Sequence, residues 1–182
     1  MNKVRTGELP WTKLDVLHRM SLDALLAKRG ITTLTEAEKV EFNRVWHRGR
    51  PWPDSVAGLT RLKKRFTIAP LSNGNIALMT NMAKRAGIPW DAILGAEVVQ
   101  AYKPQPEAYT RTAEVLGIRP SELCLVAAHN GDLKAARAAG LATAFVPRPT
   151  EHGPGQAGDL DPSEAWDAVG RDFQDLAAKL GC

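Results

Sequence analysis

The sequence has little cysteine and no long hydrophobic run, and each shortage excludes a class of protein. Only two cysteines occur in 182 residues, Cys124 and Cys182, without the spacing of a disulfide framework or a thiolate metal site. Residues 1–10 are polar, so they do not form the apolar stretch of a secretory signal. No run approaches the ~18 apolar residues that a membrane span needs. We therefore expect a cytoplasmic protein without a membrane partner.

An excess of charge of one sign is also missing. Lysine and arginine together number 24 against 20 aspartates and glutamates, which gives a formal net charge of +4. The basic residues are scattered, mostly on the polar faces of predicted helices, so no nucleic-acid partner is expected. With 44% hydrophobic and 24% charged residues, the composition suits one globular domain with room for a small second lobe.

The pattern of apolar residues divides the chain into two parts. Residues 12–48 repeat apolar side chains at helical spacing, and Thr35 with Glu38 forms a capping-box pattern at the start of a second helix. The segment 50–54, Arg-Pro-Trp-Pro-Asp, breaks any helix. Beyond it, short apolar runs alternate with helical patterns, which predicts an α/β fold around a mainly parallel sheet.

The second part can be divided into predicted elements. Asp54 is placed to cap its first helix, and the segment 147–162, rich in glycine and proline, predicts a long surface loop. Strands are predicted at residues 67–71, 93–99, 123–127 and 142–146. A closing helix is predicted at residues 166–180. Polar clusters follow several of these strands, and open α/β sheets place their sites at such strand ends.

Three polar clusters are candidates for a site, and each also has a purely structural explanation. Ser72 and Asn73 end one predicted strand, where a hydroxyl and an amide can bind an anion or simply cap the next helix. Lys103 lies before a proline that holds it extended, so its ammonium is either a fixed positive charge or ordinary solvated surface. His129 can titrate near neutrality at the end of another strand, with Asp132 in the next helical turn, or the two can cap that helix.

In this order, the three clusters resemble motifs two, three and four of the haloacid dehalogenase (HAD) superfamily. Four strings look most like its type II, or (S)-2-haloacid dehalogenase, branch: PLSNGN (70–75), AYKPQPEAY (101–109), VAAHNGDLKAARAAG (126–140) and FVPRPTEHGPGQ (145–156). The resemblance implies a Rossmann-like core with a parallel sheet at residues 51–182 and a partial helical cap at residues 1–50. It also implies a homodimer formed through the cap helices.

The residue after the strand at 123–127 separates two kinds of activity in this superfamily. Its phosphatases carry the pattern Val-Gly-Asp-Ser-x-x-Asp and hold Mg²⁺ partly with the first of these acidic residues. The chain reads Val126-Ala127-Ala128-His129-Asn130-Gly131-Asp132, so Ala128 stands at that position and offers no oxygen ligand. We therefore expect no metal and no other cofactor, and a small 2-halocarboxylate as substrate. A phosphatase-like hydrolase is the alternative.

The resemblance also implies roles for individual residues. In this branch a carboxylate displaces halide from C2 of the acid, and water then hydrolyses the aspartyl ester. Lys103 would orient and charge-stabilise the nucleophile, Ser72 would bind the substrate carboxylate or the nucleophile, and Asp132 would position or deprotonate the water. A second group is implied to line the substrate: Asn73, Tyr109, His129 and Asn130.

The nucleophile that the resemblance requires is not found in the sequence. The superfamily places it in an N-terminal strand with the pattern Phe-Asp-x-x-Gly-Thr, and no such string occurs here. In the implied fold this first strand lies centrally, between the strands that end at Ser72 and at Ala128. We therefore expect two unpaired sheet edges, or two halves that close against each other in an altered sheet, and no halide release from 2-chloropropionate by the 182-residue chain. A non-catalytic remnant is the alternative outside the enzymes.

Overall fold

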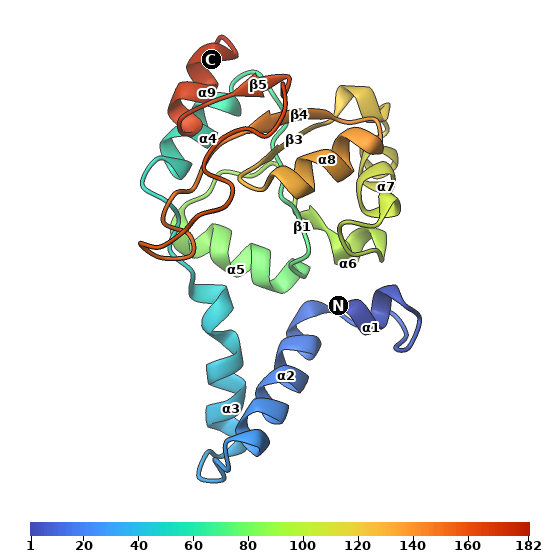
Figure 1. Cartoon of the computed structure of the whole chain (residues 1–182), viewed down its shortest axis with the longest axis vertical. Coiled ribbons are helices and arrows are strands. Elements are labelled where there is room, and N and C mark those ends of the chain that lie inside the picture. Colours follow the sequence, from blue (N-terminus) through green and yellow to red (C-terminus); the bar gives the residue numbers. More distant parts are fainter.

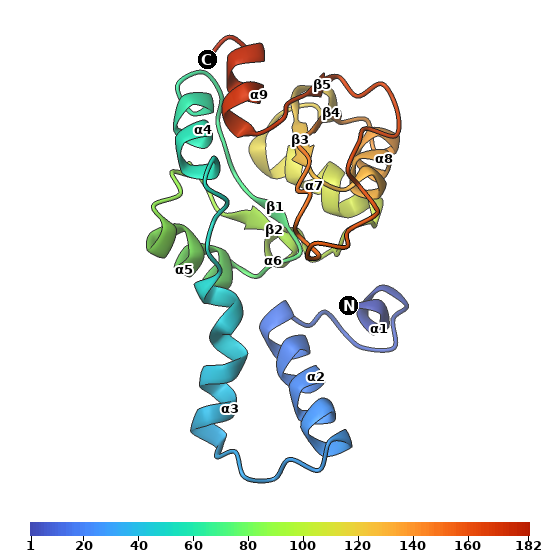
Figure 2. The same cartoon turned by 60° about the vertical axis from the view of Figure 1, so that its left-hand side comes forward.

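An α/β lobe with a helical projection makes up the molecule (Figure 1). A computed structural model describes residues 1–182, the whole chain. We use "the lobe" for residues 51–182 and "the projection" for residues 14–48, which extend away from the lobe as two neighbouring helices (Figure 2). None of the helices is both long and apolar enough to cross a membrane.

Helices and short strands alternate along the lobe, whereas the residues before it are helical. The elements in chain order are α1 (Asn2–Arg5), α2 (Leu14–Lys28), α3 (Glu36–Asn43), the 3-10 helix η1 (Arg44–Arg48), α4 (Ser55–Leu62), β1 (Leu71–Ser72), α5 (Ile76–Ala86), β2 (Leu94–Gly95), α6 (Ala96–Val99), α7 (Pro106–Leu116), the 3-10 helix η2 (Pro120–Glu122), β3 (Cys124–Ala127), α8 (Asn130–Ala138), β4 (Ala142–Phe145), β5 (Ala168–Val169) and α9 (Phe173–Lys179). The segment 147–162 contains neither helix nor strand, as its composition predicts.

The strands form two separate parallel sheets. In the smaller sheet β1 pairs with β2, and Leu71 lies opposite Leu94. The larger sheet has the order β3-β4-β5, with Cys124 opposite Ala142 and with Phe145 of β4 opposite Val169 of β5. β1 and β3 therefore each have one edge that no strand pairs with. The predicted α/β class with a parallel sheet is confirmed, and so are the two unpaired edges.

The strand predicted at residues 67–71 was wrong in extent, because only Leu71–Ser72 is a strand. Pro70 has no N–H to donate to a neighbouring strand. The Ile68 N–H donates to the Asp91 carboxylate instead (2.9 Å), and the Asp91 N–H donates back to the Ile68 carbonyl (2.8 Å). This exchange with a loop residue takes the place of strand pairing.

The predicted strand at 93–99 and the predicted helix at 166–180 were also wrong in extent, since the strand β2 covers only Leu94–Gly95 and the helix α9 only Phe173–Lys179. The first turns into α6 after Gly95, which has a φ of +154° and lies so close to β1 that a Cβ there would stand 2.6 Å from the Ser72 carbonyl oxygen. The second contains β5, and its helix α9 begins only after Asp172. The Asp172 carboxylate caps α9 by accepting a backbone N–H from its first turn (2.7 Å).

The core of the lobe lies on both faces of β4. Phe145 packs on one face with Leu133 of α8, whereas Ala144 packs on the other with Leu176 of α9, and all four are fully buried. Successive residues of a strand point to opposite faces, so one strand serves both layers. Burying a side chain of this size stabilises the fold by about 1.5–3 kcal/mol.

An ion pair closes the seam between α4 and α9. The N-cap of α4 is Asp54, but its side chain does not cap that helix, so this prediction was wrong. The carboxylate instead accepts hydrogen bonds from both Nη atoms of Arg148 (2.8 and 3.0 Å) and from the Phe173 N–H (2.8 Å). Burial acts to raise the pKa of Asp54, but these hydrogen bonds outweigh it and hold the pKa below its ordinary value.

The projection is shaped by local interactions and is fastened to the lobe at its base. The capping box at Thr35 and Glu38 is confirmed: the Glu38 N–H donates to Thr35 Oγ1 (3.3 Å), and the Thr35 N–H donates to Glu38 Oε2 (2.8 Å). At the base, the Asp15 carboxylate lies 3.0 Å from His47 Nε2 and accepts a hydrogen bond from Asn75 of the lobe (2.9 Å). These contacts join α2, η1 and the start of α5.

Candidate active site

The first part of the candidate site is the turn between β1 and α5. Ser72 Oγ accepts the Gly74 N–H (3.0 Å), which folds the turn back on the end of the strand. The Ile76 N–H at the start of α5 donates to Glu97 Oε2 (2.8 Å). One of the helix N–H groups that the sequence seemed to offer to an anion is therefore already bound to a carboxylate.

Asn73 joins this turn to the second predicted cluster. The Lys103 N–H donates to Asn73 Oδ1 (2.8 Å), and Asn73 Nδ2 donates to the Lys103 carbonyl (3.5 Å). The two residues are thirty positions apart in the sequence, so the pairing fixes the segment after α6 against the end of β1. The side chain of Asn73 has a structural task here besides any contact with substrate.

Lys103 reaches from this pairing to the third cluster. Its Nζ lies 2.5 Å from Asp132 Oδ2, and the two side chains are only 17% and 16% exposed. The Tyr109 hydroxyl donates to the other oxygen, Asp132 Oδ1 (2.7 Å). Both oxygens of Asp132 are thus engaged, one by an ammonium and one by a phenol.

The phenol of this group is held in its neutral form. Tyr109 is fully buried, and burial followed by the hydrogen bond to Asp132 raises the pKa of its hydroxyl far above the ordinary value. It therefore remains a hydrogen-bond donor at any physiological pH. Two opposite charges at ~4 Å attract by about 4 kcal/mol at an effective dielectric of ~20, before desolvation is subtracted. Lys103 and Asp132 form a partly desolvated pair that a second carboxylate can share.

Arg5 is a charged neighbour of this group that no sequence motif singled out. It lies in the short helix α1, outside the three motifs, and one of its Nη atoms donates to the Lys103 carbonyl. The other donates to Asn2 Oδ1 (2.8 Å), and its Nε is buried without a hydrogen-bond partner. Both acceptors are uncharged. Arg5 therefore adds a positive charge beside this group that no carboxylate pairs with, while the Glu97 carboxylate lies at the neighbouring turn.

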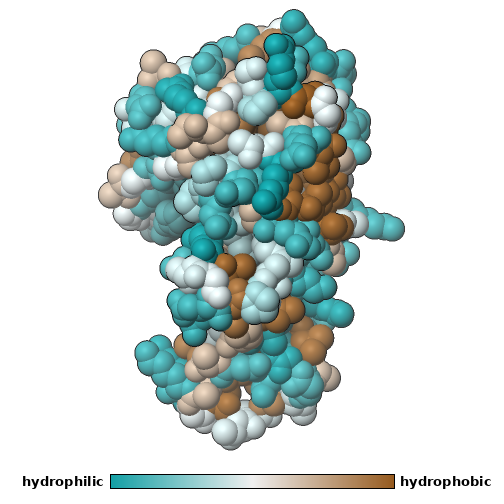
Figure 3. All heavy atoms as spheres, turned by 90° about the vertical axis from the view of Figure 1, so that its right-hand side faces the viewer, coloured by the Kyte–Doolittle hydropathy of each residue, from teal (hydrophilic) through white to brown (hydrophobic).

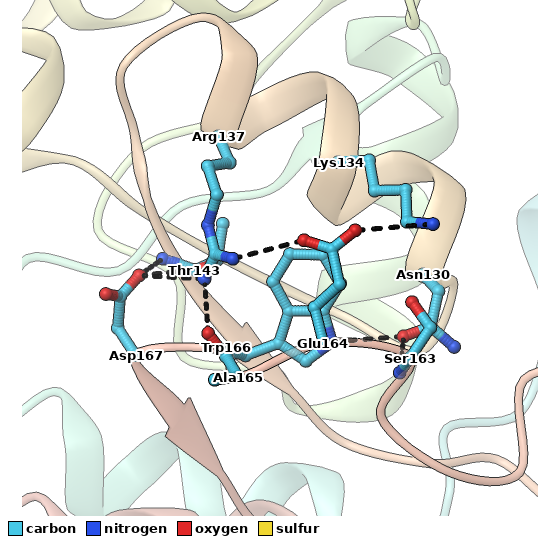
Figure 4. A network of polar contacts seen from close by, with 9 residues as sticks. All are labelled: Asn130, Lys134, Arg137, Thr143, Ser163, Glu164, Ala165, Trp166 and Asp167. Atoms are coloured by element: carbon cyan, nitrogen blue, oxygen red, sulfur yellow. Dashed lines mark hydrogen bonds and ion pairs between the residues drawn. The ribbon is translucent and has the colours of Figure 1, made fainter.

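The remaining predicted residues lie around the start of α8. Asn130 is engaged by the chain that follows the long loop: its Oδ1 accepts the Ser163 N–H (2.9 Å) and Trp166 Nε1 (3.0 Å), as Figure 4 shows. His129 precedes α8 and its Nε2 lies 3.0 Å from a Glu151 oxygen. Neither side chain makes a hydrogen bond to the Lys103–Asp132 pair. Their predicted contact with substrate stays a prediction.

Ala128 stands between β3 and His129, as the sequence indicates. It brings no oxygen to the end of the strand, and the one carboxylate of this motif, Asp132, already serves Lys103 and Tyr109. The donor set at this position does not suit a hard cation such as Mg²⁺, which takes six oxygen ligands. The group is suited to stabilising an anion and to moving a proton through Asp132.

This geometry is that of a hydrolase of the haloacid dehalogenase class, and the chain belongs to that family. The family description haloacid dehalogenase-like hydrolase matches residues 2–140. Two solved structures are closely similar over nearly the whole chain. The defluorinating L-2-haloacid dehalogenase Rha0230 is 52% identical with a TM-score of 0.97, and the chain covers 75% of it. The L-2-haloacid dehalogenase PA0810 is 49% identical with a TM-score of 0.95, and the chain covers 77% of it.

Curated relatives agree with this placement in the type II branch. (S)-2-haloacid dehalogenase 1 of Pseudomonas sp. (strain CBS-3) is 33% identical over 132 residues, which are 70% of this chain. The match spans 57% of that protein, so the chain corresponds to little more than half of its length. A phosphoglycolate phosphatase of Neisseria meningitidis is 35% identical over 100 residues, 53% of this chain and 43% of that protein.

Proposed function

We propose that the chain carries the substrate-binding and hydrolytic part of a dehalogenase that cleaves the carbon–halogen bond of a small 2-halocarboxylate. The observation that carries this proposal is the partly buried group of Lys103, Asp132 and Tyr109, joined through Asn73 to the turn at Ser72. The haloacid dehalogenases among the relatives support the substrate class. We place the reaction in the cytoplasm, where two unpaired cysteines remain reduced.

Each residue of the site has a chemical task in this proposal. Lys103 attracts the attacking carboxylate and holds it in line with C2, since its ammonium is already fixed by Asp132. Ser72 Oγ and Asn73 face the substrate carboxylate and the departing halide. Asp132 accepts a proton from the water that hydrolyses the ester, while Tyr109 keeps the Asp132 carboxylate in place.

Three further residues complete the proposed surroundings of the substrate. Arg5 supplies an unpaired positive charge that attracts an anionic substrate and a leaving halide. His129 and Asn130 line the end of β3 on the side of the long loop. We assign residues 1–50 to a helical cap over this end of the sheet, and residues 51–182 to the core.

The nucleophile is proposed to lie on a strand between β1 and β3. Each of these strands has one unpaired edge, and both end at the proposed site. A strand added there would satisfy the free backbone groups of both edges. It would also bring a carboxylate at its end close to Lys103. We expect the 182-residue chain alone to release no halide.

A graft tests the proposal directly. The first strand and following loop of the dehalogenase Rha0230 would be joined to the N-terminus of this chain, and halide release from (S)-2-chloropropionate would be measured. We expect turnover by the graft and none by the 182-residue chain. Lys103→Met in the graft should lower the rate about 100-fold or more, as loss of a group acting on the nucleophile does. The matched control is Lys134→Met, since Lys134 is an exposed lysine on α8 that pairs only with Glu164.

Other results would point elsewhere. A graft that hydrolyses phosphoglycolate in a Mg²⁺-dependent way would favour the phosphatase alternative. The Neisseria relative supports this alternative, whereas Ala128 argues against it. A folded graft without either activity would favour a non-catalytic remnant. Turnover by the ungrafted chain would overturn the proposed place of the nucleophile.

We also propose that a second copy of the chain covers the apolar face of the projection. Seven of its exposed hydrophobic side chains lie on α2, α3 and η1: Val16, Met20, Leu25, Val40, Phe42, Val45 and Trp46. Brown, apolar atoms are visible along the projection in Figure 3. Light scattering during gel filtration should give the mass of a dimer, and Phe42→Asp should give a monomer. Val115→Asp is the control, because Val115 is equally exposed but lies on α7. A monomeric wild-type chain would refute the dimer.

A further inference from the structure

A cluster of side chains that can act as metal ligands lies at the end of β3, and it shares His129 with the proposed surroundings of the substrate. The long loop at 147–162 returns to His129 and brings Glu151 and His152 beside it. One ligand atom from each of the three residues lies within 4.8 Å of the others. His129 Nε2 is 3.0 Å from Glu151 Oε2, and the two imidazole rings are nearly parallel, at 12°, with centroids 6.3 Å apart.

The charges around this cluster favour a cation. Glu151 contributes one carboxylate and Asp159 contributes another, and both imidazoles help to lower the pKa of Asp159 after the larger effect of the Asn130 N–H. The one arginine of the loop, Arg148, does not neutralise them, because it is bound to Asp54 through both Nη atoms. Glu151 and Asp159 are therefore paired with no arginine or lysine.

The two sides of the cluster are held in place by other contacts. Asn130, next to His129, donates through Nδ2 to Asp159 Oδ1 (2.9 Å) and to the Asp161 carbonyl (3.0 Å). Figure 4 shows how its Oδ1 also fastens the chain at Ser163 and Trp166 to α8. The loop thus returns along α8 without depending on Glu151 or His152. Their side chains are exposed and free to adjust.

We propose that His129, Glu151 and His152 form a site for a borderline divalent transition metal of the Zn²⁺ class. Two imidazoles and one carboxylate are a ligand set that binds Zn²⁺, Ni²⁺ or Cu²⁺ in preference to Mg²⁺ or Ca²⁺. A tetrahedral Zn²⁺ with ligands at about 2.0–2.1 Å needs ligand atoms about 3.4 Å apart. Rotation of exposed side chains supplies that closure from 4.8 Å. The bound metal replaces the contact between His129 and Glu151, and water takes the fourth position.

The position of this site gives the metal a specific effect on the structure. His129 lies three residues before Asp132, and Glu151 and His152 lie in the first half of the long loop. A bound metal therefore fastens the loop to the end of β3, next to α8. This effect does not depend on the reaction that the chain performs.

The test uses the 182-residue chain and Co²⁺ and Zn²⁺ as probes. Calorimetry with ZnCl₂ should show one binding site per chain. His152→Ala and Glu151→Gln should each lower the affinity for Zn²⁺ about tenfold or more. The matched control is His18→Ala, since His18 lies on α2 far from the loop in sequence and should leave the affinity unchanged. Limited proteolysis within residues 147–162 should slow when Zn²⁺ is added to the wild type, but not when it is added to His152→Ala.

The Co²⁺ spectrum identifies the ligands. Binding through imidazole and carboxylate should give weak visible bands without an intense thiolate charge-transfer band in the near ultraviolet. Such a charge-transfer band would show that Cys124 or Cys182 is the ligand, and it would overturn the proposal. Unchanged affinity in both loop variants would overturn it as well, as would a loss of binding in His18→Ala. Circular dichroism of each variant separates loss of the site from loss of the fold.

Discussion

Eight of the 13 large hydrophobic side chains that the structure leaves exposed belong to the projection, and only two of its hydrophobic residues, Leu17 and Leu26, are buried. The lobe shows the reverse, because it buries 21 hydrophobic residues and exposes four large ones. Both regions contain amphipathic helices. They differ in that a sheet lies beneath the helices of the lobe, whereas α2 and α3 have mainly each other to pack against.

This difference in burial indicates which contacts stabilise each region. In the lobe, contacts between distant parts of the chain dominate, as in the packing of α8 and α9 on opposite faces of β4. In the projection, short-range contacts dominate, as in the capping box and the pairing of Arg19 with Asp23 and Glu36. Substitutions in the lobe should therefore cost more free energy of unfolding than matched substitutions in the projection.

The largest expected effect is the removal of a leucine from the core. Leu133 of α8 is fully buried, and Leu133→Ala should lower the free energy of unfolding by about 2–5 kcal/mol, through lost burial and a remaining cavity. The matched variant is Leu25→Ala in α2, with both leucine variants made in the monomeric Phe42→Asp chain; there the leucine is 52% exposed and the cost should stay within about 0.5 kcal/mol. Urea unfolding measures both. Equal costs would mean that the projection is buried in solution.

The ion pair between Asp54 and Arg148 should come next. Asp54→Asn removes the charge that binds Arg148 where both side chains are little exposed, and it should cost about 3 kcal/mol near neutral pH. The pKa of Asp54 is lower in the folded chain than in the unfolded chain. Its contribution is therefore complete above the unfolded pKa of about 3.9 and is lost as the pH falls toward the folded value.

The pH dependence provides the check on this assignment. The stability difference between the wild type and Asp54→Asn should be constant above about pH 5 and should shrink below about pH 4. Asp161→Asn is the control, because Asp161 is exposed and only its backbone carbonyl accepts a hydrogen bond. A difference that persists at low pH would show that shape, and not charge, holds α4 to α9.

Two local signals in the sequence predicted local features correctly, although the cap expected at Asp54 did not form. The capping box at Thr35 and the loop at 147–162 depend on residues within a few positions of each other, and both are confirmed. The strand at 67–71 failed because its pairing is decided by Asp91, which lies outside the segment. Apolar content alone does not reveal such a competitor.

The candidate site shows the same division. Parallel topology brings strand ends together, so the order of the motifs was enough to expect Lys103 near Asp132. Arg5 was missed because it lies in no motif, and its contact with the Lys103 carbonyl spans 98 positions. The cluster of His129 with Glu151 and His152 was missed because the path of a long loop cannot be read from its composition.

A smaller effect is expected at the base of the projection. The Asp15 carboxylate accepts hydrogen bonds from His47 and from Asn75, which is 2% exposed. Asp15→Ala leaves these groups without their partner and should cost about 1–3 kcal/mol. Lys28→Ala on the same helix is the control, since Lys28 is exposed and its side chain forms no ion pair. Hydrogen exchange of α2 and η1 should rise in the first variant only. If it rises in both, the base of the projection does not depend on this contact.

The smallest expected effect comes from removing the side-chain cap at the start of α3. Thr35→Ala removes the side-chain acceptor of the Glu38 N–H at the start of α3 and should cost about 1 kcal/mol. Because α3 has few distant contacts, the loss should show as faster hydrogen exchange in its first turn, while the exchange of α8 stays unchanged. Thr33→Ala changes an equally exposed threonine two residues earlier, outside the helix, and should have no such effect. If the two variants behave alike, the helix start is held by packing, and the contrast between local stability in the projection and distant contacts in the lobe is weaker than the structure indicates.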